Sequence, residues 1–212
     1  MPQSRRYKKK KSAGKAILAW IIVLAILAAG VFVFVSVFYE DAKKKLDEMN
    51  YPRTYSTYVE KAAKDYDLDP ALIYAVIHTE SGFDPKAESG VGAKGVMQMM
   101  PSSFEWLQEQ RGCAGQYTED DLFDPEICID YGSYLLKYFY DYYGTERSAI
   151  AAYNAGFVVS DWLNDTNYSS DGKNLDSIPY PETENYVDKV ESAKEMYIKP
   201  VSYTHLRAHE TE

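Results

Sequence analysis

Cysteine and histidine are scarce in this chain of 212 residues, which has only 2 Cys and 3 His. Two of the histidines, His205 and His209, lie in residues 201–212, whose pattern and composition differ from those of the preceding sequence. This end resembles a translated sequencing adapter, and we exclude it from the fold. No cluster of His, Cys and carboxylate side chains with ligand spacing remains, so the sequence predicts neither a metal site nor a cofactor.

Basic residues are few outside the N-terminal part of the chain. The sequence has 23 Lys and Arg against 32 Asp and Glu, a net charge of −9. Ten of the basic residues lie at or before Lys45, where Glu40 and Asp41 are the only acids. From residue 46 onward, 13 basic residues therefore stand against 30 acidic ones, a net charge of −17. Because nucleic-acid binding needs clustered Lys and Arg, this balance argues against a nucleic-acid partner.

The chain does contain a long uncharged run, from Ala16 to Phe38, preceded by a basic segment at residues 1–15. A helix of this length reaches about 34 Å, enough for a hydrocarbon core of about 30 Å. A buried core helix is one alternative, and a cleaved signal peptide is a closer one. Signal peptides have shorter apolar regions and end in small residues, which this run does not. We therefore predict a retained transmembrane helix at 16–38, with the basic tail in the cytoplasm and the remainder outside the cell.

The rest of the chain reads as a stalk followed by one domain. Residues 39–55 are polar and mixed in charge, which is typical of a stalk, and residues 56–200 form the domain. A hydrophobic content of 46% with 15% aromatic residues favours a folded protein. Proline-started and glycine-ended helical patterns recur, and no stretch reads as a strand, so the domain is predicted to be all-α. Helices are expected at 56–65, 70–81, 102–110, 125–143, 146–155 and 182–197, with a capping box at Ser102–Glu105 and an exposed loop at 161–176.

Glu80 is the acid that the sequence singles out. It follows an apolar helical run in which Ile73, Val76, Ile77 and Glu80 share one face, and Gly82 is positioned to end the helix. A poorly hydrated carboxyl has a raised pKa and is suited to donate a proton near neutral pH. The alternative is that Glu80 is exposed at the helix end. His78 lies off the apolar face and is interpreted as a surface or loop-packing residue.

Four motifs occur in order around Glu80 and downstream of it. They are E-S-x-F at 80–83, Ser89 with G-A-x-G-x-M-Q-x-M-P at 92–101, A-Y-N-A-G at 152–156, and I-P-x-x-E-T-x-x-Y-V at 178–187. In these motifs the sequence resembles the soluble lytic transglycosylase (SLT, goose-lysozyme-like) family of peptidoglycan-cleaving enzymes, over about residues 56–198. The resemblance implies an all-α, lysozyme-like catalytic domain and glycan strands of peptidoglycan as the binding partner.

The resemblance also implies a mechanism with a single acid. Glu80 would protonate the glycosidic oxygen between N-acetylmuramic acid and N-acetylglucosamine. The resulting carboxylate would then take the proton of the muramic C6 hydroxyl, which closes onto C1 and gives a 1,6-anhydro product. Ordinary glycosidases use two carboxylates, but Asp84, beside Pro85, is interpreted as a turn residue. The alternatives are a hydrolytic muramidase acting on the same bond and a non-catalytic peptidoglycan-binding scaffold.

The same resemblance implies a set of substrate-binding residues, with core packing an equal interpretation for the two methionines. The set is Ser89, Met97, Gln98, Met99, Tyr153, Asn154, Glu182 and Tyr186.

Two further features leave alternatives open. Tyr131, Tyr134, Tyr138 and Tyr142 recur at helical spacing, which is typical of a packing stripe, although tyrosine rings also stack on sugars. Cys113 and Cys128 would face a space that permits disulfides. We predict a disulfide between them, with two independent thiols as the alternative.

Overall fold

The computed structural model describes residues 13–198. Most of the predicted basic tail (residues 1–15) and all of the predicted non-native tail (residues 201–212) lie outside the described residues. The chain divides into two compact units, Met1–Asn50 and Tyr51–Glu212.

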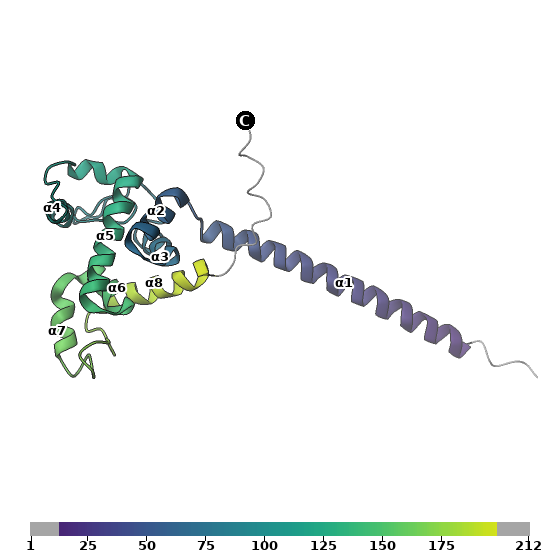
Figure 1. Cartoon of the computed structure of the whole chain (residues 1–212). Coiled ribbons are helices and arrows are strands. Elements are labelled where there is room, and N and C mark those ends of the chain that lie inside the picture. The colour runs from purple at the N-terminus through teal and green to yellow at the C-terminus, as the bar shows by residue number, and fades with distance from the viewer. Residues whose placement is uncertain (1–12, 199–212) are drawn as a thin grey trace, which may run out of the picture. The chain divides into compact units, whose positions relative to one another are not determined.

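In the first unit the described residues form a long helix, α1 (Ala13–Asn50; Figure 1). From Ile17 onward it includes an 18-residue window with a mean hydropathy of 3.0, none of which is buried. At 38 residues the helix is about 57 Å long, well beyond the hydrocarbon core of about 30 Å. It continues without a break through residues 39–50, the first part of the predicted stalk. By length and composition, α1 is a candidate membrane span.

The second unit is built from helices. They are α2 (Ser56–Tyr66), α3 (Pro70–Ser81), α4 (Pro101–Gln110), α5 (Pro125–Tyr143), α6 (Glu146–Ala155), α7 (Val159–Asn164) and α8 (Pro181–Ile198), with short 3-10 helices η1 (Glu119–Phe123) and η2 (Gly156–Val158). Within residues 13–198, the β pairing is confined to two isolated bridges that both involve Lys94. The predicted all-α class is confirmed.

Local chemistry explains where the two central helices begin and end. The carboxylate of Asp69 accepts from the backbone N–H of Ala71, with proline in the first turn of α3. Gly82 ends that helix at φ 59°, a left-handed conformation that favours glycine. Asp124 and Gly144 use the same two devices on α5. Glu80, one residue before the end of α3, is thereby fixed in position.

Two local predictions are wrong. The α4 helix starts at Pro101, with Met100 as its N-cap and no side-chain cap, so the capping box at Ser102–Glu105 does not form. The proline already supplies the favoured φ of the first turn. The predicted loop at 161–176 begins inside α7, because Trp162 and Leu163 are buried in the core. Burial of two large apolar side chains outweighs the polar composition around them.

The α3 helix is the centre of the domain. It packs most extensively against α8 and also against α2, while α6 packs against α5 and α8 (Figure 1). Every residue from Ala71 to Ile77 is buried. The sequence predicted burial of only one face of this helix, whereas neighbouring elements bury it on all sides. At its C-terminal end this apolar environment gives way to half-buried Glu80.

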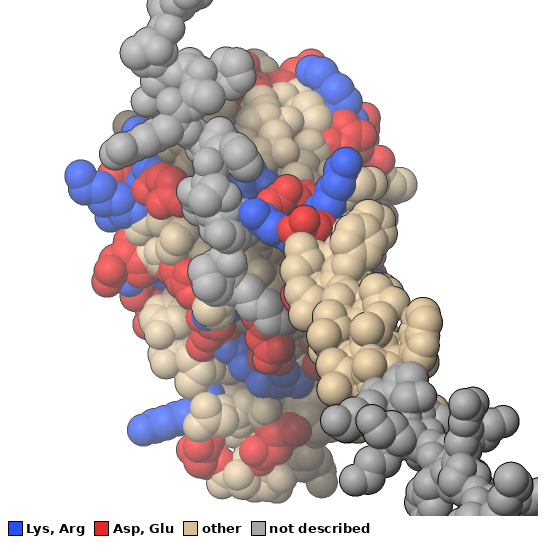
Figure 2. All heavy atoms as spheres, turned by 90° about the vertical axis from the view of Figure 1, so that its right-hand side faces the viewer, with Lys and Arg blue, Asp and Glu red and all other residues tan. Residues whose placement is uncertain are grey.

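An ion-paired lysine joins the helices around α3. Lys194 of α8 lies 2.7 Å from a carboxylate oxygen of Glu146 and 3.5 Å from one of Asp69. Because Asp69 is also the N-cap of α3, this group joins the start of α3 to α6 and α8. Figure 2 shows one face of the molecule, on which acidic and basic side chains are interspersed without an extended basic surface.

The tyrosine stripe on α5 divides into two parts. Tyr131 is buried with its ring edge-on to Phe104, at a centroid distance of 4.7 Å. Tyr134 and Tyr138 are half-buried, whereas Tyr142 remains 58% exposed. Core packing accounts for the first tyrosine but not for the last.

Candidate active site

Glu80 lies near the C-terminal end of α3, where α8 passes beside it. Its side chain is half-buried, and its Oε1 atom accepts a hydrogen bond from the hydroxyl of Tyr186 at 2.8 Å. Tyr186 is buried on α8. The most extensive helix pair of the domain therefore brings together two residues more than a hundred positions apart.

Burial raises the pKa of Glu80 from its ordinary value of 4.5 to about 7. The Tyr186 hydrogen bond acts in the opposite direction because it favours the carboxylate, but the loss of hydration outweighs it. Near neutral pH the side chain thus exchanges between its acid and its carboxylate form. A group in this state can donate a proton in one step and accept one in the next.

Tyr153 lies on α6 within the electrostatic influence of Glu80. Burial, together with the charge of Glu80, raises its pKa well above 10, so the phenol stays neutral. Its hydroxyl donates to the backbone carbonyl of Met97 at 2.9 Å. In this structure Tyr153 therefore joins α6 to the loop before α4, and its direct bond is to that loop rather than to Glu80.

Ser89 and Gln98 hold the glycine-containing loop between α3 and α4. The amide nitrogen of Gln98 donates to the carbonyls of Ala87 and Gly95, each at 3.0 Å. The hydroxyl of Ser89 accepts from the N–H of Ala93. Both side chains shape the loop, and their predicted contacts to a sugar stay a prediction.

Gly95 explains why this loop needs glycine. Its φ is +76°, and a Cβ atom there would lie 2.0 Å from the carbonyl oxygen of Leu122 and 2.9 Å from the sulfur of Cys128. Only glycine fits this approach without moving the backbone. The loop is thereby held against η1 and the start of α5.

Met97 and Met99 belong to the core. They are 0% and 2% exposed, and Met97 packs so closely on Gly132 that a Cβ there would meet its sulfur at 2.5 Å. Of the two interpretations of these residues, core packing is the one that the structure favours, since neither side chain has surface to offer a ligand. The backbone carbonyl of Met97 remains important as the acceptor for Tyr153.

Asn154 and Glu182 lie at the neighbouring edge of α6 and α8. The amide oxygen of Asn154 accepts from the hydroxyl of Thr183 at 2.8 Å, and Glu182 is exposed in the first turn of α8. Thr183 was not predicted, although it adjoins Glu182 in the fourth motif. Its buried hydroxyl fixes the orientation of an otherwise exposed amide.

Other polar groups near Glu80 have different functions. Asp84 is exposed and its carboxylate accepts from the N–H of Lys86, as expected of a turn residue. Among residues 13–198, no other acidic side chain hydrogen-bonds to Glu80. His78 is half-buried among the rings of Tyr51, Phe83 and Tyr197, which agrees with loop packing. In the described part of the chain, no group of three or more His, Cys, Asp or Glu side chains is placed to hold a metal ion.

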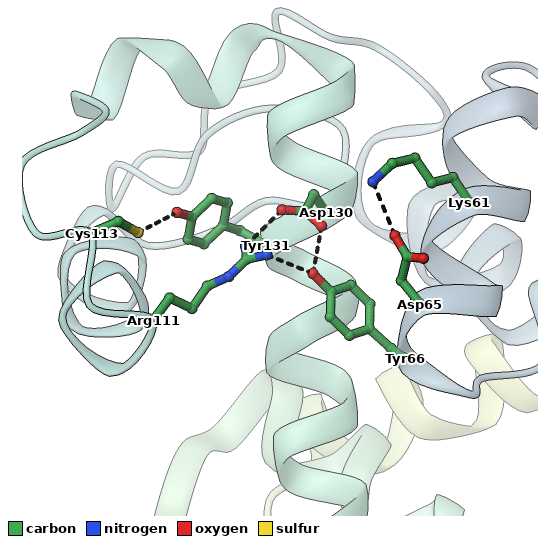
Figure 3. Close-up of polar contacts among 7 residues, drawn as sticks. All are labelled: Lys61, Asp65, Tyr66, Arg111, Cys113, Asp130 and Tyr131. Carbon is green, nitrogen blue, oxygen red and sulfur yellow. Dashed lines mark hydrogen bonds and ion pairs between the residues drawn. The ribbon is translucent and has the colours of Figure 1, made fainter.

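The predicted Cys113–Cys128 disulfide is absent, and both cysteines are free thiols. Cys113 points to the hydroxyl of Tyr131 at 3.3 Å, beside the Arg111, Asp130 and Tyr66 network (Figure 3). Cys128 is buried, and its sulfur accepts from the N–H of Met97 at 3.4 Å. The loop after α4 therefore meets α5 one turn beyond Cys128, at Tyr131. Burial raises the pKa of the Cys128 thiol to about 12.

Comparison with known proteins adds independent information. The family described as "Transglycosylase SLT domain" matches residues 57–175. The soluble lytic murein transglycosylase of Escherichia coli (strain K12) is 32% identical over 146 residues, which cover 68% of this chain and 23% of that protein. Membrane-bound lytic murein transglycosylase C of Actinobacillus succinogenes is 30% identical over 68% of this chain and 47% of its own length.

A solved structure is similar as well. Lytic transglycosylase Slt from Pseudomonas aeruginosa, determined as an inactive mutant with a glutamate replaced by glutamine, superposes with a TM-score of 0.62 at 30% identity. The match covers 71% of this chain and 25% of that one. The predicted lysozyme-like helical fold is thus confirmed. The chain spans about a quarter of the length of the first of these relatives and about half of the second.

Proposed function

This chain belongs to the family of the transglycosylase SLT domain, and from that premise we propose that it is a peptidoglycan lytic transglycosylase. Its substrate is the β-1,4 bond between N-acetylmuramic acid and N-acetylglucosamine. The observation that carries the proposal is the state of Glu80, half-buried beside Tyr186 with a pKa of about 7. Relatives with the printed name lytic murein transglycosylase support the same substrate class.

The reaction proceeds in two proton transfers through one residue. Protonated Glu80 donates to the glycosidic oxygen, the bond from that oxygen to C1 of muramic acid breaks, and N-acetylglucosamine leaves with a free hydroxyl. The Glu80 carboxylate then accepts the proton of the C6 hydroxyl as that oxygen bonds to C1. The product is a 1,6-anhydro ring, Glu80 is again protonated, and no water is consumed. A pKa near the working pH suits both steps.

The neighbouring side chains have supporting functions in this scheme. Tyr186 donates to Glu80 and stabilises its carboxylate form between the two steps. Tyr153, which stays neutral, is available beside the carboxyl to orient it or to contact the acetamido group of the substrate. Ser89 and Gln98 shape the loop that faces the muramic sugar, while Asn154 and Glu182 contribute polar groups at the edge formed by α6 and α8.

The proposal includes a location in the cell. Residues 16–38 of α1 anchor the protein in the cell membrane as a single pass, the N-terminus is cytoplasmic, and the domain of residues 56–200 lies outside. The basic residues before the apolar run support this orientation, and a membrane-bound relative supports the association with a membrane. Protease added to intact, wall-stripped cells should remove the domain. Complete protection of the domain would contradict this topology.

The experiment that tests the function is mass spectrometry of peptidoglycan digested by the full chain and by Glu80→Gln. Wild-type products should end in 1,6-anhydromuramic acid, lighter by one water than hydrolytic products. The variant should lose at least about 10²–10⁴-fold of the rate, the usual contribution of a positioned proton donor, while Asp84→Asn should cleave nearly normally. Reducing ends would identify a muramidase instead, and binding without any cleavage by the wild type would identify a scaffold.

A further inference from the structure

Four aromatic side chains from three separate elements meet on the surface of the domain. They are Trp106 of α4, Tyr138 and Tyr142 of α5, and Phe157 of η2, called here the aromatic patch. Tyr142 is 58% exposed and Phe157 is 48% exposed, while the other two are half-buried. Isolated exposed apolar residues are ordinary on protein surfaces, but a contiguous group of rings indicates a binding surface.

The rings hold one another in fixed positions. Trp106 lies edge-on to Tyr138 at a centroid distance of 5.0 Å, and Tyr138 stacks on Tyr142 at 6.3 Å. Phe157 lies edge-on to each of the other three, at 6.4, 6.2 and 5.8 Å. Beneath them, Phe139 anchors Phe157 from the core at 5.4 Å. A ligand that stacks here therefore orders few side chains on binding, so less conformational entropy is lost.

Two segments of the chain connect the aromatic patch with the residues around Glu80. Phe157 follows Tyr153 by four residues, which limits the separation of their Cα atoms to about 15 Å. Trp106 lies on α4, which begins at Pro101, two residues after Met99. Those two segments are themselves joined by the bond from the Tyr153 hydroxyl to the Met97 carbonyl. The chain connections thus limit the distance from Tyr153 to the patch to a few sugar lengths.

We propose that the aromatic patch is an extended binding site for the glycan strand, which holds sugar rings beyond the pair that is cleaved. This inference rests on the proposed function. Flat aromatic rings, two of which carry a hydroxyl at the edge, suit the apolar faces and polar rims of pyranoses. A lipid surface is the less suitable occupant, because the chain from residue 46 onward carries a net charge of −17 and would be repelled by anionic headgroups. The patch thus provides preference for long strands over short fragments.

The test uses the full chain in detergent micelles with Glu80→Gln as the common background, so that bound glycan is not cut. Binding to purified long glycan strands is compared with binding to a short muropeptide, for Tyr142→Ala and Phe157→Ala. Each variant should bind long strands about tenfold more weakly, since truncation of a central aromatic contact commonly has an effect of this size. The loss for the short muropeptide should be clearly smaller. Tyr142 is exposed enough for its variant to fold.

A matched control is available in Tyr140→Ala, which removes an exposed aromatic ring outside the patch. This variant should bind long strands as the parent does. In the active background, Tyr142→Ala should raise KM for long strands with little change in kcat, as expected when binding is lost equally from ground and transition states.

Several outcomes overturn the inference. They are unchanged binding of long strands by both patch variants, an equal loss for long and short ligands, or an equal loss in the Tyr140→Ala control. Failure of the proposed function would look different, because the wild type would then give reducing ends or cleave no glycan, while the binding comparison could still be read.

Discussion

Glu80 should destabilise the folded domain at the pH where its carboxylate forms. Its pKa rises from 4.5 to about 7 on folding because burial removes water from the carboxyl. Between these pH values the folded state binds more protons than the unfolded state, so the free energy of unfolding decreases as pH rises through the window. At about 1.4 kcal/mol per pH unit, a difference of about 2.5 pH units corresponds to about 3 kcal/mol, reached above pH 7.

Glu80→Gln removes this penalty because glutamine carries no charge at any pH, and its Oε1 atom still accepts from Tyr186. At pH 8 the variant should be more stable than the wild type by up to about 3 kcal/mol. At pH 4 the two proteins should unfold nearly alike, since the wild-type carboxyl is then largely protonated in both states. Urea unfolding of the full chain in detergent micelles, in a Cys113→Ser background, can be followed by labelling of the buried Cys128 thiol.

Glu105→Gln is the matched control, because Glu105 is exposed on α4 and should change stability by no more than about 0.5 kcal/mol at either pH. Equal stability of Glu80→Gln and wild type at pH 8 would refute the argument that burial dominates at this carboxyl. A gain of the same size at pH 4 and pH 8 would refute it too, since a packing effect would not depend on protonation.

Three further predictions concern the site and its support. If Glu80 is the general acid, kcat/KM should fall as pH rises above about 7. Tyr186→Phe should move this fall in the pH–rate profile to higher pH by about one unit, because a hydrogen bond to a charged group contributes about 1.5–3 kcal/mol. A shift to lower pH would contradict the role of Tyr186. Gly95→Ala should destabilise the domain by more than about 2 kcal/mol, because residue 95 has a φ of +76° and its new Cβ would lie 2.0 Å from a carbonyl oxygen. Gly90→Ala is the control, since a Cβ there has open space, and it should unfold in urea as the wild type does. Maleimide should label Cys113 in the unreduced folded protein and Cys128 only after denaturation. Dithiothreitol should not change the melting temperature. If both cysteines stay unreactive after denaturation without reductant, the disulfide prediction would be correct after all.

The helical plan of the domain could be read from local chemistry. Asp69 with Pro70 and Asp124 with Pro125 start helices through contacts within two residues, and Gly82 ends one through its own φ. Such signals are legible because both partners are neighbours in the chain. Where two local devices compete, as at Pro101 and Ser102, the sequence alone does not say which one starts the helix.

Long-range packing decided what local signals left open. From the sequence, Met97 and Met99 could line the ligand site or pack in the core. In the structure both are buried, and Met97 packs closely on Gly132 of α5, so they belong to the core. The disulfide prediction failed for a similar reason, since spacing along the chain does not reveal which turn of α5 the Cys113 loop meets. The aromatic patch likewise combines three elements, of which the tyrosine spacing on α5 indicated one.

The sequence by itself determined that Glu80 follows an apolar helix, that its motifs resemble a family of single-acid enzymes, and that the domain is helical and acidic. The tertiary structure decided how that acid behaves. The pKa of a carboxyl depends on the water it loses and the donors it gains. For Glu80 both depend on α8, which brings Tyr186 to α3 from a distant part of the chain.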